Sequence, residues 1–227
     1  MTAYDRLATM VREQILAGKL REGDRLPTEA EISTSYQVSR NTAREALRVL
    51  ASQGLVTIRR GGTGGVFVTL PSPAQIAESV QVGVGLMAEN HRISPQALSQ
   101  FREMLEVPAA ELAAVHRTET ELAAIHATLF DPTEVDVVDL YTSSRDFHFR
   151  VLAATHNPLL EIFAEPIFRV LNERFLGKQV PEHVSHRIDR EHREILYHLR
   201  TQNRAGAREA TRAHLRCLHL MQREQMP

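Results

Sequence analysis

Three histidines occupy positions where the sequence pattern expects buried apolar residues. His148, His192 and His214 lie on three separate predicted helices, each flanked at helical spacing by apolar residues, and Ser144 lies one turn before the first of them. One core histidine is commonly satisfied by a hydrogen bond, but burying three imidazoles without a shared partner is costly. Neutral ring nitrogens bind transition metals. The trio therefore predicts a divalent metal site, for zinc or nickel.

A charged residue lies inside another apolar stripe. Arg102 belongs to a helix predicted over residues 95–116. The apolar members of its stripe are Leu98, Phe101, Leu105, Ala109 and Leu112. A buried guanidinium needs an anion. Glu106, one turn further on, can supply it, and so can a bound carboxylate ligand, because the planar fork of arginine grips carboxylates well.

A second group of residues that can bind a ligand lies on a helix predicted over residues 40–53. One side of this helix is apolar, through Ala43, Ala46, Leu47 and Leu50. Arg40, Asn41, Arg44 and Arg48 share the other side. Arginine reads guanine, asparagine reads adenine, and either can hold a phosphate. A solvated polar face would look the same, but a capped helix and a turn precede these residues, as in a helix-turn-helix, whose second helix enters the major groove.

A glycine-rich hairpin is predicted directly after this helix. Its strands are residues 55–60 and 66–68, and five residues, four of them glycine, separate them. Arg59 and Arg60 precede Gly61 and Gly62, which places two cations beside a tip with almost no side chains. Such a tip can approach the phosphate backbone or enter the minor groove. After a helix-turn-helix, it is typical of the wing of a winged helix.

The elements that position these residues divide the chain into two parts. Residues 1–70 predict a winged helix-turn-helix of three helices (4–17, 28–37 and 40–53) and a hairpin. Residues 71–73, Pro-Ser-Pro, predict a linker. Residues 74–227 predict an all-α bundle of six or seven helices. Its expected segments are 74–88, 95–116, 119–129, 135–155, 159–177, 184–201 and 205–225. The fold class is therefore mostly α.

Composition and charge exclude several classes of protein. The chain has 227 residues, 43% hydrophobic and 24% charged, which excludes a disordered polyelectrolyte. No apolar run approaches the roughly 18 residues of a membrane span, and the first residues lack a signal-peptide pattern. The single cysteine, Cys217, suits a reducing cytoplasm. Residues 1–70 carry a net charge of +3 and the remainder −4, which places any nucleic-acid surface in the first third.

Three motifs run through the N-terminal part: Gly23-Asp24-x-Leu26-Pro27-Thr28-Glu29, Val38-Ser39-Arg40-Asn41-Thr42-x-Arg44-Glu45-Ala46-Leu47 and Gly54-Leu55-Val56. With the glycine-rich hairpin, they make residues 4–70 resemble the GntR family of bacterial transcription regulators. The resemblance implies DNA contacts from Ser39, Arg40, Asn41, Thr42 and Arg44, and from the wing at residues 59–62. Ala30 stands where many members carry a DNA-contacting arginine, a departure that concerns operator preference rather than DNA binding.

The C-terminal part has motifs of its own: Arg102-x-x-Leu105-Glu106-x-Pro108-Ala109-Ala110, Asp146-Phe147-His148 with Asn157-Pro158-Leu159 after it, and the pair His192 and His214. Residues 74–222 thus resemble the FCD ligand-binding domain of FadR-like GntR regulators. Metal-binding members hold the ion with an aspartate and three histidines. The aspartate position is Ser144 here, a weak neutral ligand that removes one negative charge.

The same resemblance implies an effector. In this branch the metal or a nearby arginine holds a small organic acid, which implies effector-binding roles for Arg102 and Asn157. Some members without the metal bind acyl-CoA instead, and the three histidines retained here argue against that version.

These observations predict a cytoplasmic transcriptional repressor, a homodimer whose two winged helices read a palindromic operator and respond to a small carboxylate. Two alternatives remain. The helical part can bind acyl-CoA or only dimerise, without metal, or the three histidines can form the zinc site of a metalloenzyme. The enzyme alternative lacks a general base, because no Glu or Asp is expected on the inward stripes of the three histidine helices.

Overall fold

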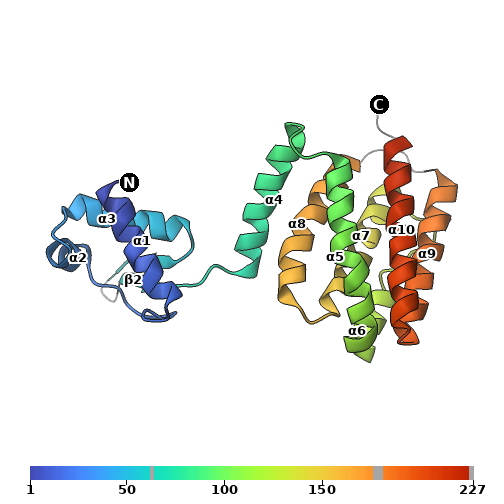
Figure 1. Ribbon diagram of the computed structural model, residues 1–227, viewed down its shortest axis with the longest axis horizontal. Helices are drawn as coiled ribbons and strands as arrows, with labels where there is room; N and C mark the ends of the chain where they lie inside the picture. The colour runs from blue at the N-terminus through green and yellow to red at the C-terminus, as the bar shows by residue number, and fades with distance from the viewer. Residues whose placement is uncertain (62–63, 176–180, 225–227) are drawn as a thin grey trace. The chain divides into compact units, whose positions relative to one another are not determined.

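The computed structural model describes residues 1–61, 64–175 and 181–224. In this part of the chain there are ten helices and one two-stranded hairpin, which confirms the predicted mostly α fold class (Figure 1). The chain separates into two compact units, Met1–Ile76 and Ala77–Pro227. None of the described helices is long and apolar enough to cross a membrane.

The first unit is built around three short helices, α1 (Ala3–Leu16), α2 (Glu29–Ser35) and α3 (Arg40–Ser52). Thr2 and Thr28 form capping boxes that satisfy the first free amides of α1 and α2. The core contains the apolar side of α3 together with residues of α1 and α2, among them Leu7, Val11, Ile32, Ala43, Leu47 and Leu50. This packing leaves the polar side of α3 facing outward.

The hairpin consists of β1 (Val56–Arg59) and β2 (Gly65–Val68), paired antiparallel from Val56↔Val68 to Arg59↔Gly65. Val56 and Val68 are buried and attach its base to the core. Arg25 supports the outer end, because its guanidinium donates a hydrogen bond to the Gly64 carbonyl over 2.9 Å. Gly61 has a φ of 111°, a conformation that favours glycine over any other residue.

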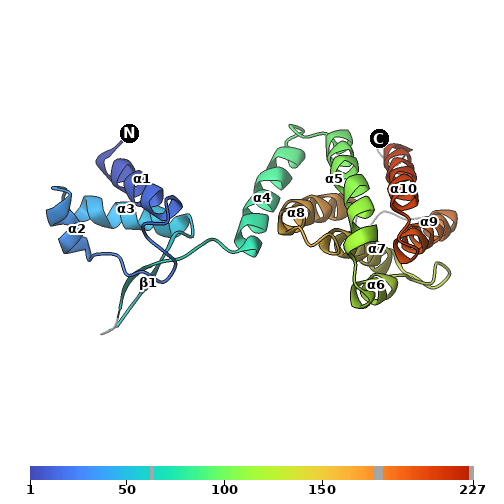
Figure 2. The ribbon, with the colours of Figure 1, turned by 60° about the horizontal axis from the view of Figure 1, so that its bottom comes forward.

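The described part of the chain after residue 72 contains seven helices, within the predicted range. They are α4 (Pro73–Glu89), α5 (Pro95–His116), α6 (Glu119–His126), α7 (Val137–Ala153), α8 (Pro158–Phe175), α9 (Glu182–Arg200) and α10 (Arg204–Glu224). Helices α5, α7, α8, α9 and α10 lie side by side along most of their length (Figures 1 and 2). Because α4 begins at Pro73, the last residue of the predicted linker belongs to a helix.

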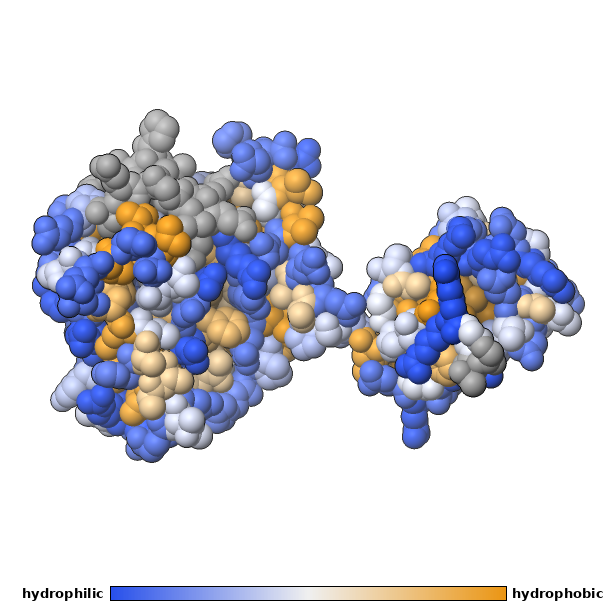
Figure 3. Space-filling view, turned by 180° about the vertical axis from the view of Figure 1, so that it is seen from behind, coloured by the Kyte–Doolittle hydropathy of each residue, from blue (hydrophilic) through white to orange (hydrophobic). Residues whose placement is uncertain are grey.

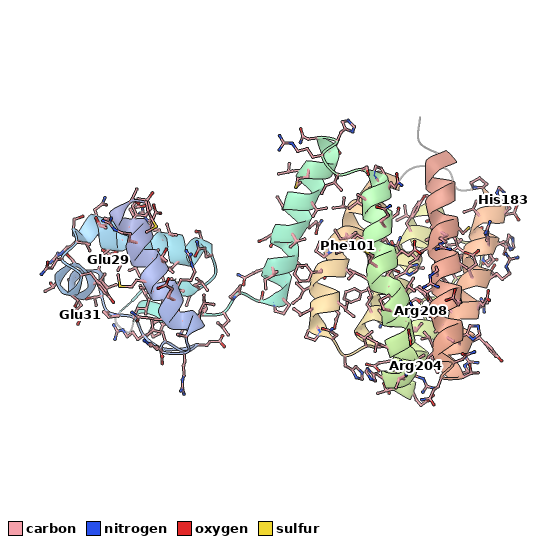
Figure 4. All side chains as sticks on the ribbon, viewed as in Figure 1. Glu29, Glu31, Phe101, His183, Arg204 and Arg208 are labelled. Atoms are coloured by element: carbon pink, nitrogen blue, oxygen red, sulfur yellow. The ribbon has the colours of Figure 1, made fainter. Side chains whose placement is uncertain are left out.

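Small residues allow α5 and α10 to pack closely. Ala110, Ala113 and Ala114 of α5 are fully buried, and they share a core cluster with Phe147 of α7. Arg204 and Arg208 of α10 both donate hydrogen bonds to Glu111 of α5, over 3.0 and 2.8 Å; Figure 4 shows these two arginines along the lower half of α10. The histidine-bearing helices α7, α9 and α10 thus contribute to a core in which the alanines of α5 pack against larger apolar side chains, with ion pairs at its rim.

Leu112 corrects one prediction, and some helix ends differ by two or three residues from those expected. Leu112, assigned to the apolar stripe of α5, is 39% exposed, because the alanines form the buried face and Leu112 lies to one side of it. Helix α6 ends at His126 rather than residue 129, and α7 begins at Val137 because Asp136 caps it, accepting from the Asp139 amide over 2.8 Å. The predicted helix ends at residues 177 and 225 lie outside the described residues.

Candidate DNA-reading surface and metal centre

The start of α3 presents the predicted DNA-contacting residues to solvent. Ser39 caps the helix, and its hydroxyl accepts a hydrogen bond from the Thr42 amide over 3.0 Å. The two hydroxyl oxygens of Ser39 and Thr42 are 2.8 Å apart. Arg40 and Asn41 follow on the exposed first turn. This helix start therefore offers an amide, a guanidinium and hydroxyl groups on one surface, with α3 anchored behind them by its apolar side.

Two arginines further along α3 are already paired with carboxylates. Nε and Nη2 of Arg44 donate to the carboxylate of Glu29 on α2 over 3.0 and 2.8 Å. This bond from Arg44 is the main reason why the pKa of Glu29 is lowered. Arg48 donates to Glu45 over 2.8 Å. All four side chains are at least 37% exposed, and ion pairs at such exposure contribute little to stability. Their arginines can therefore exchange a carboxylate for a phosphate at small cost.

The wing carries two exposed cations. Arg60 is exposed, as is Arg59, whose guanidinium lies 4.8 Å from the centre of the Phe67 ring. That contact holds the Arg59 side chain against the hairpin. Gly61 follows at the described edge of the tip, and Gly62, also predicted to contact DNA, lies outside the described residues.

The second unit brings the three predicted histidines together in its interior. Nε2 of His214 lies 3.1 Å from Nε2 of His148 and 3.3 Å from Nε2 of His192. The three ligand atoms all lie within 4.8 Å of one another, and each side chain is at most 4% exposed. Nitrogens about 2.0–2.1 Å from a tetrahedral zinc ion are about 3.3–3.4 Å apart, and the two Nε2–Nε2 distances from His214 are close to this value.

Two carboxylates stand behind this trio. Glu106 Oε2 accepts from Nδ1 of His148 over 2.7 Å, and Glu191 Oε2 accepts from Nδ1 of His214 over 2.8 Å. Burial raises the pKa of Glu106, but Arg102 and then His148 outweigh it and lower the value to about 2. Burial lowers the pKa of His148 to about 4. At neutral pH the site thus contains an ionised Glu106 and a neutral His148 that can bind a cation.

One sequence expectation about acidic residues is corrected by this geometry. No Glu or Asp was expected on the inward stripes of the histidine helices, yet Glu191 of α9 bonds His214 and Asp189 of α9 is 8% exposed. Glu191 precedes His192 and lies off the apolar stripe, but its long side chain reaches across to α10. The only hint in the sequence is an acid next to a core histidine.

Arg102 is bound by a residue of its own helix. Its Nε donates to Glu106 Oε1 over 2.5 Å, and its guanidinium carbon lies 4.9 Å from the centre of the Phe168 ring. The chain's own carboxylate therefore supplies the anion, as in the first of the two alternatives. Phe168 also borders a cavity of about 190 Å³ between α7 and α8.

The other two candidate residues lie less centrally. Ser144 is half-buried one turn before His148 and, among the described residues, forms no hydrogen bond with the trio. Asn157 is exposed, and its side-chain oxygen accepts from the Leu159 amide over 3.2 Å at the start of α8. Asp146, which precedes His148 by two residues, pairs with Arg145 over 2.8 Å.

Comparison with known proteins gives the family. Residues 3–68 match the family model of bacterial regulatory proteins of the gntR family, and residues 97–216 match the FCD domain. The chain is 30% identical over 223 residues to a putative L-lactate dehydrogenase operon regulatory protein of Escherichia coli, covering 95% of this chain and 84% of the relative. It is 28% identical over 219 residues to the Uxu operon regulator of Haemophilus influenzae, covering 93% and 79%.

A solved structure shows the same fold. Streptococcus agalactiae GntR superimposes with a TM-score of 0.67 at 22% identity, over 96% of this chain and 99% of that one. The relatives are transcriptional regulators, so the metalloenzyme alternative is excluded and the prediction that the chain is not an enzyme is confirmed. With a DNA-reading unit and a helical unit built around a histidine cluster, this chain belongs to the GntR family of transcriptional regulators and carries an FCD domain.

Proposed function

We propose that this regulator is a cytoplasmic repressor that binds a palindromic operator as a homodimer and releases it in response to a small carboxylate bound near a metal ion. The observation that carries this proposal is the convergence of three imidazole nitrogens, 3.1 and 3.3 Å apart, in the same chain as an outward-facing helix-turn-helix. The first feature supports a sensor and the second supports a reader of DNA.

On the DNA side, Arg40 and Asn41 are the residues that we assign to base edges, since they occupy the exposed first turn of α3. Ser39, Thr42, Arg44 and Arg48 would hold phosphates beside them. Arg59, Arg60, Gly61 and Gly62 of the wing would contact the backbone or the minor groove.

A second copy of the chain is proposed because a palindromic operator requires a two-fold symmetric reader. The helical unit exposes large apolar side chains that a partner can cover: Val82, Leu86 and Met87 on α4 and Met104 on α5 are between 46% and 68% exposed. Figure 3 shows hydrophobic side chains reaching the surface on one face of this unit. Monomers rarely leave such residues uncovered in groups.

A zinc or nickel ion fits His148, His192 and His214, because buried neutral imidazoles are its usual ligands and the spacing matches. Three protein ligands leave an open coordination position, which Ser144 can occupy only weakly. The bound ion would supply a positive charge that attracts a carboxylate.

The proposed effector is a small organic acid whose carboxylate takes that open position. Arg102 and Asn157 stay candidates for its other contacts, although Arg102 is shared with Glu106. The Escherichia coli relative is named for an L-lactate dehydrogenase operon, and lactate is a small 2-hydroxy acid. Acids of that size are therefore the first to test. Coupling between such sites is typically about 1–3 kcal/mol, or 5- to 150-fold in operator affinity.

The test measures operator affinity of purified protein with and without candidate acids, before and after removal of metal by a chelator. Elemental analysis of the protein as isolated identifies the ion. The double variant His148→Ala/His214→Ala should lose the ion, several degrees of melting temperature and the response to acid, while still binding DNA. A wild-type protein that binds the operator but contains no metal and ignores every acid would leave the helical unit as a dimerisation domain only.

A further inference from the structure

Two buried or half-buried carboxylates, Glu106 and Glu191, contact the outer nitrogens of the histidine trio, and they do not contact all three rings in the same way. Glu106 is 3% exposed and Glu191 has a side chain 13% exposed, and each contacts Nδ1 of one histidine. They come from different helices, α5 and α9, so the pairing is not a by-product of one helical repeat. Among the described residues, His148 and His214 each have a carboxylate partner on Nδ1 and His192 has none.

A carboxylate that is ionised can only accept hydrogen bonds. At 2.7 and 2.8 Å from Nδ1, Glu106 and Glu191 therefore require the ring proton of His148 and His214 to be on that nitrogen. Each ring then directs the lone pair of Nε2 towards the centre of the trio. Arg102, 2.5 Å from the other oxygen of Glu106, holds that carboxylate in place.

Away from the other two histidines, the His192 ring is held by packing, and its Nδ1 forms no hydrogen bond with the described residues. Its ring stacks on Phe147, with the ring centres 4.0 Å apart and the planes 5° from parallel. Its Nδ1 is buried and has no hydrogen-bond partner among the described residues. Its Nε2 lies 3.3 Å from Nε2 of His214, which is an acceptor in the tautomer that Glu191 selects. Without an ion, His192 is best satisfied when its proton is on Nε2 and points at His214.

We infer that Glu106 and Glu191 are positioning residues of the metal centre and that His192 is the ligand that changes tautomer when the ion binds. On loading, the His192 proton leaves Nε2 and is replaced by one on Nδ1, so the ring stays neutral and its Nε2 lone pair turns to the ion. His148 and His214 keep their tautomers. This inference rests on the metal site of the proposed function.

The first experiment measures zinc affinity by competition with a chromophoric chelator in Glu106→Gln and Glu191→Gln. Loss of an outer carboxylate should weaken zinc binding about 10- to 100-fold. Matched controls are Glu103→Gln on α5, which pairs with Arg216, and the exposed Glu194→Gln on α9; both should bind as wild type. Glu191→Gln is the decisive variant if Glu106→Gln fails to fold, because Glu191 lies closer to the surface.

The second experiment reads the ring protons directly, by ¹⁵N NMR of histidine-labelled full-length protein with and without zinc. His148 and His214 should carry the proton on Nδ1 in both states, and His192 should change from Nε2–H to Nδ1–H on loading. The zinc affinities of the glutamine variants test the role of the carboxylates, and this pattern tests the tautomers.

The possible results distinguish failure of the metal site from failure of the inference about the carboxylates and His192. If the wild-type chain binds neither zinc nor nickel, the metal site and this inference both fail. If the wild type binds zinc and both glutamine variants bind it equally well, or His192 already has its proton on Nδ1 without zinc, only the inference is overturned.

Discussion

The two units of this regulator use ion pairs in opposite settings. On α3 the pairs Arg44–Glu29 and Arg48–Glu45 are exposed, with side-chain exposures of 37% or more. Inside the helical unit, the pair Arg102–Glu106 is 12% and 4% exposed and connects directly to His148. Water screens the exposed pairs on α3, so their arginines remain available to DNA. The buried pair Arg102–Glu106 is desolvated, so each of its charges depends on the other for stabilisation.

Removing the buried cation should give the largest effect. Arg102→Met leaves the Glu106 carboxylate buried without its main counter-charge, and we expect a loss of about 3–5 kcal/mol in unfolding free energy. Urea unfolding of metal-free protein, followed by far-UV circular dichroism, measures it. Arg169→Met is the control, because Arg169 and Glu165 have the same four-residue spacing at 50% and 35% exposure, and it should cost no more than about 1 kcal/mol. Equal losses in the two variants would remove the contrast between buried and exposed pairs.

Acid should destabilise the metal-free helical unit. His148 titrates at about 4 in the folded chain because of burial, against about 6.5 when unfolded, so the unfolded state takes up the proton first. The stability from this group is fully present above pH 6.5 and is lost as pH falls to about 4, by about 3 kcal/mol. Thermal unfolding between pH 7.5 and 4 measures the change, and bound zinc should oppose it. A melting temperature independent of pH across this range would contradict the buried, neutral histidine.

Changes on α3 should affect DNA binding without affecting stability. Arg40→Ala or Asn41→Ala removes a side chain assigned to base edges, and operator affinity should fall about tenfold to a hundredfold. The melting temperature should stay near that of wild type, because both residues are exposed. Fluorescence anisotropy with labelled operator gives the affinity. Arg190→Ala on α9, an exposed residue with the same charge, serves as control, and a similar loss there would point to net charge alone.

The smallest effect is expected when an exposed arginine is freed. Glu29→Gln removes the carboxylate that competes with DNA for Arg44. Affinity for DNA should rise slightly, and the slope of log affinity against log salt should steepen by up to about 0.9, one extra phosphate contact. A salt titration of operator binding measures it. An unchanged slope would show that Arg44 stays with Glu29 in the complex or never reaches a phosphate.

Local features of the fold were predictable because they depend on neighbours in the chain. The capping box at Thr28 and the Ser39 cap follow from side chains three residues from their partners. The division of α3 into a buried and an exposed side follows from helical periodicity. The same periodicity gave the wrong result for Leu112. Which stripe of α5 is buried depends on the helix that packs against it.

The sequence by itself determined that three imidazoles belong in a core and that arginines face outward on α3, because the periodicity of apolar residues settles which side of each helix is hidden. Only the tertiary structure decided that Glu106 binds both Arg102 and His148, that Glu191 reaches across to His214, and that Nδ1 of His192 has no partner among the described residues. The contacts of Glu106 with His148 and of Glu191 with His214 join side chains from different helices, so they depend on how closely those helices pack.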